Sequence, residues 1–190
     1  LGGGAEAGVL LPLSMFEVVP AGPGDLPAAA RLIDAGFRQS LAATYELVGR
    51  VAFRMYVGEP ALASRLSQGV LALVARDAGS VVGYAEIQGR SRVLAGRDHL
   101  SLLFVDPAWQ RRGVARALLA GIVGRLQALP TPPAELTVNA APSALAAYRR
   151  LGFVAIGPLA MREGAPTVPM ALRLGAQTMR SISPVNSGAQ

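Results

Sequence analysis

The pattern of apolar and polar positions divides the middle of the chain into strand-like and helix-like stretches. Runs rich in β-branched residues predict strands, whereas apolar residues that recur every three or four positions predict helices. The first pattern predicts strands at Phe16–Pro20, at both arms of a hairpin in 69–89 joined at "DAGS", and at His99–Val105, Glu135–Asn139, Phe153–Gly157 and Thr167–Leu174.

The second pattern predicts four helices between these strands. Asp25 is placed to cap a first helix that runs to about Phe37 and has Pro27 in its first turn. Further helices are expected near Tyr45–Val57, over Gly113–Leu129, which is the longest, and over Ser143–Leu151. Gly152 suits the left-handed position that follows a helix. Because strands come both in hairpins and linked by helices, the expected fold is α/β (α+β) with a mixed sheet.

The ends of the chain do not share this pattern. Residues 1–14, "LGGGAEAGVLLPLS", carry no basic residue, so they lack the positive region of a secretory signal, and we interpret them as a leader or disordered extension. Residues 175–190 are polar and aperiodic, which is typical of a flexible tail. With no internal repeat, residues 15–174 are expected to form a single domain.

Composition narrows the chemistry that this domain can perform. All 18 basic residues are Arg, there is no Cys or Lys, and His99 is the sole histidine of the 190 residues. A disulfide framework, a thiolate nucleophile, a Schiff base and a P-loop lysine are therefore excluded, and no metal site is expected. Catalysis must depend on backbone amides, carboxylates, hydroxyls, one imidazole and arginines.

The net charge of +6 raises the question of a nucleic-acid partner. The arginines are scattered, with no run of three and no interleaved aromatic residues, so nucleic acid is not expected as a partner and an acidic small ligand is favoured. No stretch reaches the roughly 18 apolar residues of a membrane span, so no membrane partner is expected.

The loop "QRRGVA", Gln110 to Ala115, offers such a ligand a site. It joins a predicted strand to the start of a predicted helix, where unpaired N–H groups and the helix dipole attract anions, phosphate above all. Gly113 and Ala115 let the backbone approach the ligand, and the neighbouring arginines add attraction. An ordinary strand-to-helix turn with solvated arginines remains the alternative on spacing alone.

Two segments resemble the GNAT superfamily of N-acetyltransferases, of bacterial type. "LLFVDPAWQRRGVARALL" is similar to the family's coenzyme A-binding segment, with Gln110, Gly113 and Ala115 at the positions of its Gln/Arg-x-x-Gly-x-Gly/Ala loop. "LTVNAAPSALAAYRRLGF" resembles the second signature, with Asn139 and Tyr148 at its Asn and Tyr. The resemblance covers about residues 16–174.

The resemblance implies a mixed, mostly antiparallel central sheet flanked by helices and splayed between its fourth and fifth strands. It implies acetyl-coenzyme A as donor and, as acceptor, a primary amine of a small molecule or peptide that attacks directly in a ternary complex. A cytoplasmic enzyme is expected, and because members of the family often dimerise, a homodimer is considered as well. A non-catalytic acyl-coenzyme A-binding or regulatory protein with the same fold is the alternative, against which the retention of Tyr148 and His99 argues.

The resemblance also assigns residues to the coenzyme. In that fold the pantetheine arm lies in the gap of the sheet and hydrogen-bonds the backbone of a strand, as an added strand would. The expected coenzyme-binding residues are Leu103, Phe104, Val105, Gln110, Arg111, Arg112, Gly113, Val114, Ala115, Arg116, Asn139 and Ser143. Asn139 could instead end its strand, and Ser143 could instead cap its helix.

Tyr148 is expected to be the general acid, since it lies where the family often places one. A phenol stays protonated at neutral pH and can donate a hydrogen bond to the departing sulfur. Its helical spacing with Ala144 and Leu151 is equally typical of a core aromatic, and both roles are compatible.

For the base that takes the amine proton, His99 is the first candidate and Glu86 the second. Many family members carry a Glu or His at the position of His99, and period two would place it on the face of Leu103 and Val105, unless a bulge intervenes. A hydrogen-bonded histidine beside Asp98 is the alternative. Glu86 is expected either to act on the amine or to face solvent.

The resemblance implies that the acceptor enters over the first two helices and the final loop, here residues 37–45 and 158–166. These segments hold few carboxylates, with Glu46 and Glu163 the nearest, so a polycationic acceptor is disfavoured.

Overall fold

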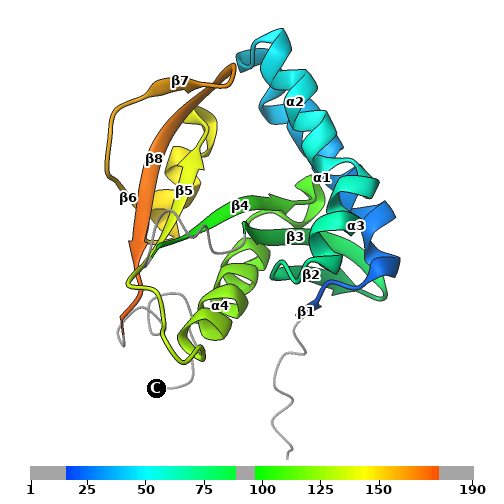
Figure 1. Cartoon of the computed structure of the whole chain (residues 1–190). Helices are drawn as coiled ribbons and strands as arrows, with labels where there is room; N and C mark the ends of the chain where they lie inside the picture. The colour runs from blue at the N-terminus through cyan, green and yellow to red at the C-terminus, as the bar shows by residue number, and fades with distance from the viewer. Residues whose placement is uncertain (1–15, 89–96, 176–190) are drawn as a thin grey trace, which may run out of the picture.

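The computed structural model describes residues 16–88 and 97–175 as a curved, mixed sheet with helices on both faces (Figure 1). The predicted leader, residues 1–14, lies outside the described residues, as does the predicted tail apart from Gly175. Among the helices that are described, none is both long and apolar enough to cross a membrane.

The sheet has eight strands in the order β1-β2-β3-β4-β5-β8-β6, with β7 paired to β8. Neighbouring strands are antiparallel except for β4 and β5, which run parallel. The strands are β1 (Glu17–Pro20), β2 (Ala72–Asp77), β3 (Ser80–Gln88), β4 (Arg97–Val105), β5 (Glu135–Ala140), β6 (Val154–Ala155), β7 (Ala160–Arg162) and β8 (Ala165–Arg173). This arrangement confirms the expected mixed, mostly antiparallel sheet.

Helices cover the two faces of this sheet separately, as Figure 1 shows for α4 below the sheet and α1 to α3 beside it. The α-helices are α1 (Leu26–Ser40), α2 (Leu47–Val57), α3 (Glu59–Ser67), α4 (Val114–Gln127) and α5 (Leu145–Arg150). One core forms where Leu118, Leu119 and Ile122 of α4 pack against the sheet. The other forms where α1 and α3 place Ile33 and Leu62 against the opposite face.

Several element predictions need correction. Helix α3 and strand β7 were not predicted, and α1, with 15 residues, is longer than α4, with 14. Asp25 does not cap α1 through its side chain. Its carboxylate accepts the Gly22 N–H at 2.7 Å and is bound by the Arg76 guanidinium at 3.0 and 2.8 Å, which ties the start of α1 to β2.

Strands β4 and β5 separate along their length. Only their first residues pair, from Arg97 with Glu135 to His99 with Thr137, and no pairing continues toward Val105 and Ala140. The parallel pair therefore opens at its carboxyl end, which confirms the predicted splay between the fourth and fifth strands. Because the backbone groups of β4 beyond the paired segment face the gap, a ligand can bind there as an added strand.

A bulge in β4 reverses part of the predicted side-chain alternation. Glu86 pairs with Leu102 but Ile87 pairs with Leu100, so Ser101 is an extra residue without a cross-strand partner. Beyond the bulge, His99 lies opposite Gln88, on the face that β3 gives to Glu86. The expectation that His99 shares a face with Leu103 and Val105 is thus wrong, and the reason is the single inserted residue.

Candidate active site

A cavity of ≈ 750 Å³ lies at the splay of the sheet. The open ends of β4 and β5, the loop before α4, helix α5 with the turn before it, and the adjoining parts of α1 and α2 surround it. Its size falls within the range of small-molecule and cofactor sites. Of the predicted coenzyme-binding residues, those that line it are Leu103, Phe104, Val105, Gln110, Arg111, Gly113, Val114, Ala115, Arg116, Asn139 and Ser143.

The amino end of α4 is open toward this cavity. No side chain caps the helix, and its first helical backbone bond is the one from the Ala117 N–H to the Gly113 carbonyl. The N–H groups of the preceding turn are therefore available to an anion, which the helix dipole also favours. Gly113 has φ 86°, in the left-handed region, and a Cβ there would meet no atom within 4 Å, so the approach is clear.

The arginines of the loop divide into two groups. Arg111, which also has a positive φ of 61°, and Arg116 line the cavity, and the Arg116 guanidinium donates to the Arg150 carbonyl at 3.4 Å. Arg112 does not line it. Its guanidinium carbon lies 5.1 Å from the centre of the ring of Trp109, a cavity residue, in a cation–π arrangement.

The Ser143 side chain contacts the end of α1 and does not cap a helix. Its hydroxyl approaches the carbonyl oxygen of Ser40, at the end of α1, at 3.5 Å, and neither the Pro142–Ala144 turn nor α5 has a side-chain cap. The side chain of Asn139 is exposed to the cavity where β5 ends. Both residues therefore lie on the side of the gap opposite β4.

Tyr148 of α5 also lines the cavity. Its ring packs edge-on against Phe153 at 5.4 Å between centroids, so it is both a packed aromatic and a cavity residue. Burial, and secondarily the nearby Tyr45 hydroxyl, raises the pKa of Tyr148 well above its ordinary value, which keeps the phenol protonated. Within the described part of the chain, no residue forms a hydrogen bond with this hydroxyl.

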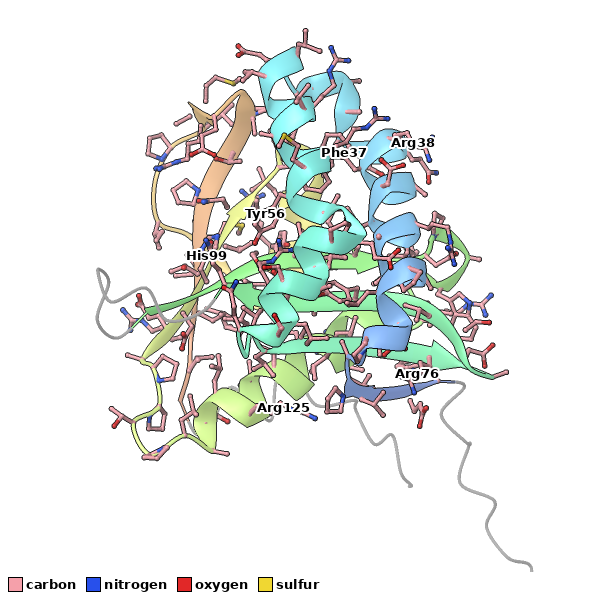
Figure 2. The ribbon with its side chains drawn as sticks, turned by 45° about the vertical axis from the view of Figure 1, so that its right-hand side comes forward. Phe37, Arg38, Tyr56, Arg76, His99 and Arg125 are labelled. Atoms are coloured by element: carbon pink, nitrogen blue, oxygen red, sulfur yellow. The ribbon has the colours of Figure 1, made fainter. Side chains whose placement is uncertain are left out.

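His99 does not line the cavity. Its Nδ1 lies 3.0 Å from the Thr137 hydroxyl, which itself donates to the Asp98 carbonyl at 3.1 Å. The Thr137 proton is therefore already used, so Nδ1–H of His99 is the donor and Nε2 carries the lone pair. Burial lowers the pKa of His99 from its ordinary 6.5, which favours this neutral ring. Figure 2 shows His99 on β4 near the point where β5 and β8 cross.

Glu86 is buried, with 1% of its surface exposed, so the alternative of a solvent-facing strand residue is wrong. The Arg65 guanidinium of α3 binds both carboxylate oxygens, at 2.8 and 3.3 Å, and the Tyr84 hydroxyl donates at 2.8 Å. Ser101 contacts the same carboxylate at 3.3 Å and lines the cavity. Glu86 thus reaches the cavity only through the hydroxyl of Ser101.

The structure adds cavity residues that sequence reasoning did not single out. Tyr45 and Phe53, from the α1–α2 region, line the cavity, as does Ser101 of the bulge. The aromatic character of Tyr45 and Phe53 in a segment otherwise rich in Ala and Arg was the available signal. No pattern marks Ser101, because its position depends on a bulge.

Comparisons with known proteins identify the family of this chain. The family model described as an acetyltransferase (GNAT) domain matches residues 41–174. The chain therefore belongs to the GNAT family of acetyltransferases. As a member of this family it is an N-acetyltransferase that depends on acetyl-coenzyme A. A search among curated proteins found no match.

Solved structures show the same fold. A GCN5-related N-acetyltransferase from Rhodopseudomonas palustris is 26% identical, with a TM-score of 0.68 over 86% of this chain and 99% of that one. The PaiA N-acetyltransferase from Thermoplasma acidophilum, in complex with coenzyme A, is 16% identical, with a TM-score of 0.66 over 83% and 98%. A ribosomal-protein-alanine N-acetyltransferase from Brucella melitensis is 24% identical, with a TM-score of 0.60 over 83% and 99%.

Proposed function

We propose that the protein transfers the acetyl group of acetyl-coenzyme A to a primary amine of a small molecule or peptide, by direct attack within a ternary complex. The observation that carries the proposal is the cavity itself. It runs from the uncapped amino end of α4, through the gap between β4 and β5, to the hydroxyl of Tyr148.

The donor is held at two places. The backbone N–H groups at the start of α4, with Arg111 and Arg116 beside them, bind the pyrophosphate of the coenzyme. The pantetheine arm lies in the splay and hydrogen-bonds the backbone of Leu103, Phe104 and Val105, which lack β5 partners there. These contacts point the thioester toward Tyr148.

Bond making and breaking then follow a balanced path. The neutral amine nitrogen bonds to the thioester carbonyl carbon, the C–S bond breaks with its electron pair on sulfur, and the nitrogen loses one proton. Tyr148 donates its phenolic proton to the sulfur as coenzyme A leaves, and solvent restores that proton. A backbone N–H of β4 near Phe104 polarises the carbonyl during attack.

His99 is the proposed base for the amine proton. His99 does not line the cavity, whereas Ser101, two residues further along β4, does, so the proton passes through water between the amine and Nε2 of the ring. Glu86 is the alternative, acting through Ser101. Its two bonds from Arg65 make it better suited to orient that hydroxyl than to accept the proton.

The test combines binding with single-hydroxyl variants. Acetyl-coenzyme A is first titrated into the wild type by calorimetry, and one-to-one binding is expected. Release of the coenzyme thiol is then followed across a panel of amines for the wild type, Tyr148→Phe and Tyr45→Phe. Loss of a general acid is expected to lower kcat of Tyr148→Phe about 100-fold without changing the affinity for acetyl-coenzyme A.

Tyr45→Phe is the matched control, because it removes a second hydroxyl from the same cavity while keeping the ring. Its kcat is expected to stay close to that of the wild type. Equal losses in both variants would contradict the role of Tyr148. Binding without any amine-dependent thiol release would support the non-catalytic acyl-coenzyme A-binding alternative, and absence of binding by the folded wild type would end the proposal.

A further inference from the structure

The part of the cavity that faces α1 and α2 has a distinctly aromatic surface. Tyr45, Phe53 and Phe104 line it, and we call these three residues the acceptor wall. Their rings contact one another directly: the centroids of Tyr45 and Phe53 are 6.3 Å apart at 78°, and those of Phe53 and Phe104 are 6.0 Å apart at 51°. The wall is therefore a continuous surface and not three separate side chains.

A buried ring holds the acceptor wall in place from behind. Phe37 of α1, with 1% of its surface exposed, stacks on Phe53 at 4.1 Å and 17° and meets Tyr45 edge-on at 5.1 Å. Figure 2 shows Phe37 between α1 and α2, the two helices that it joins. Because aromatic pairs with these geometries are mutually attractive, the wall is ordered before any ligand binds.

No carboxylate accompanies this surface. Among the described residues that line the cavity there is no Asp or Glu, and its three charged side chains, Arg111, Arg116 and Arg150, belong to the α4 and α5 end. Glu86, the carboxylate that comes nearest through Ser101, is already bound by Arg65. An acceptor with several positive charges would lose water there without gaining a counter-ion, which is costly.

The wall is also closely fitted around the cavity. Gly36 of α1 lines the cavity, and a Cβ at this position would lie 3.0 Å from Cδ1 of Phe104. Glycine inside a helix costs stability relative to alanine, so its presence here is best explained by the close approach of the Phe104 ring. Gly36 thus lets the Phe104 ring lie directly against α1, which fixes this ring within the acceptor wall.

We propose that the acceptor is an arylalkylamine: a primary amine joined by a short, flexible carbon chain to an aromatic ring. The ring stacks against the acceptor wall, and the chain carries the nitrogen toward the thioester beside Tyr148. Stacking is favourable because the rings of Tyr45 and Phe53 are already packed against Phe37 on one side and fixed in orientation. This inference rests on the proposed acetyltransferase function and adds the chemical class of its acceptor.

The experiment compares three amines at saturating acetyl-coenzyme A: phenethylamine, cyclohexylethylamine of matched size, and spermidine. We expect kcat/KM to be highest for phenethylamine, about 10-fold or more above spermidine, since a desolvated site rejects an unpaired charge more strongly than a change of shape. Cyclohexylethylamine separates ring stacking from simple apolar burial and is expected to lie between the two.

Two variants on α2 make the test specific. Phe53→Leu keeps an apolar side chain but removes the ring, and it is expected to raise KM for phenethylamine about 3- to 10-fold. Met55→Ala, two residues away, alters a side chain that is 73% exposed and does not line the cavity, so it is expected to leave KM unchanged. Calorimetry with acetyl-coenzyme A is run on each variant.

The outcomes separate this inference from the function on which it rests. If acetyl-coenzyme A binds and spermidine is acetylated as efficiently as phenethylamine, or Phe53→Leu has the KM of the wild type, the arylalkylamine class is wrong while the acetyltransferase function stands. Binding of acetyl-coenzyme A with no turnover of phenethylamine overturns the class in the same way. If acetyl-coenzyme A does not bind, the proposed function fails first and the inference fails with it.

Discussion

The hydrogen bonds of one threonine decide how the ring of His99 can act. Thr137 donates its proton to the Asp98 carbonyl, so its oxygen must accept from His99 Nδ1. The alternative of a histidine engaged near Asp98 and the role of base are therefore compatible, since one nitrogen is structural and the other carries a lone pair. Asp98 contributes its backbone carbonyl to this arrangement.

This arrangement predicts a particular pH dependence. Burial lowers the pKa of His99 below 6.5. As the pH is lowered from 7, the ring therefore stays neutral until this pKa is reached, and below it the protonated ring can no longer act as a base. The acid limb of kcat, measured at saturating amine, is expected to have its midpoint below pH 6.5. In His99→Gln that limb should disappear and kcat should fall about 100-fold.

The control for this prediction is the affinity for acetyl-coenzyme A across the same pH range, which is expected to be equal in the wild type and in His99→Gln. An acid limb that persists unchanged in His99→Gln would assign the titration to another group, with Glu86 acting through Ser101 as the first alternative.

At the residue scale, the sequence predicted the positions of residues within one local segment better than those that depend on distant contacts. Most of the predicted coenzyme residues line the cavity, because a strand, a loop and a helix start fix them relative to one another. His99, Glu86 and Arg112 do not line it, and each depends on something non-local. His99 depends on the bulge at Ser101, Glu86 on an arginine from α3, and Arg112 on the ring of Trp109.

At the scale of elements, α4 carries the anion site through its amino end. The helix has 14 residues, buries Leu118 and Ile122 against the sheet, and so holds its uncapped first turn fixed beside the cavity. Gly113 ends the loop in a left-handed conformation that most side chains avoid. Asparagine and aspartate are the residues that tolerate this conformation best after glycine.

Gly113→Asp and Gly113→Asn therefore form a matched pair for the phosphate site. Both side chains have the same shape and backbone tolerance, and only aspartate places a negative charge where the pyrophosphate is proposed to lie. We expect Gly113→Asp to bind acetyl-coenzyme A about 10-fold or more weakly than Gly113→Asn, as charge repulsion at a few ångströms requires. Calorimetric titration measures both.

High salt provides the internal check on this pair. Because the two side chains have the same shape, screening by salt should reduce the difference between the affinities of the two variants for acetyl-coenzyme A. Equal affinities at low salt would place the pyrophosphate away from Gly113 and contradict the proposed donor site.

Element boundaries show what local pattern can predict. The hairpin of β2 and β3 follows from alternation and a Gly-containing turn, and Gly152 after α5 has the expected positive φ of 95°. Helix α3 was missed because a single residue, Gly58, separates it from α2, and its nine residues are too few to show a clear period. Strand β7, with three residues, is defined only by its pairing with β8.

At the scale of the whole molecule, the two sides of the acceptor region are joined above the splay. The Glu46 N–H, just before α2, donates to the Gly164 carbonyl at 2.8 Å, and Gly164 lies in the turn between β7 and β8. Figure 1 shows α2 meeting this turn, so the sheet beyond the splay and the helices over β3 are connected at a second point. The predicted acceptor segments, 37–45 and 158–166, thus lie on either side of one contact.

Gly49 of α2 makes this contact possible. A Cβ on Gly49 would lie 2.5 Å from the Gly164 carbonyl oxygen and 2.7 Å from its carbon, whereas a Cβ on Gly124 of α4 would meet nothing within 4 Å. Gly49→Ala must therefore push α2 away from the β7–β8 turn, at a cost of about 1–3 kcal/mol in the free energy of unfolding. Gly124→Ala, also within a helix, should instead stabilise the protein by roughly 0.5–1 kcal/mol. Denaturant titration of the two variants measures both changes.

The displacement of α2 in Gly49→Ala should also alter the acceptor wall, but not the proposed coenzyme site. Helix α2 carries Phe53 and follows Tyr45, whereas the proposed coenzyme contacts come from β4, β5, α4 and the turn before α5. Gly49→Ala is accordingly expected to raise KM for the amine while leaving the affinity for acetyl-coenzyme A at the wild-type value. If Gly49→Ala weakens the binding of the amine and of acetyl-coenzyme A equally, the contact supports the whole sheet and not the acceptor side alone.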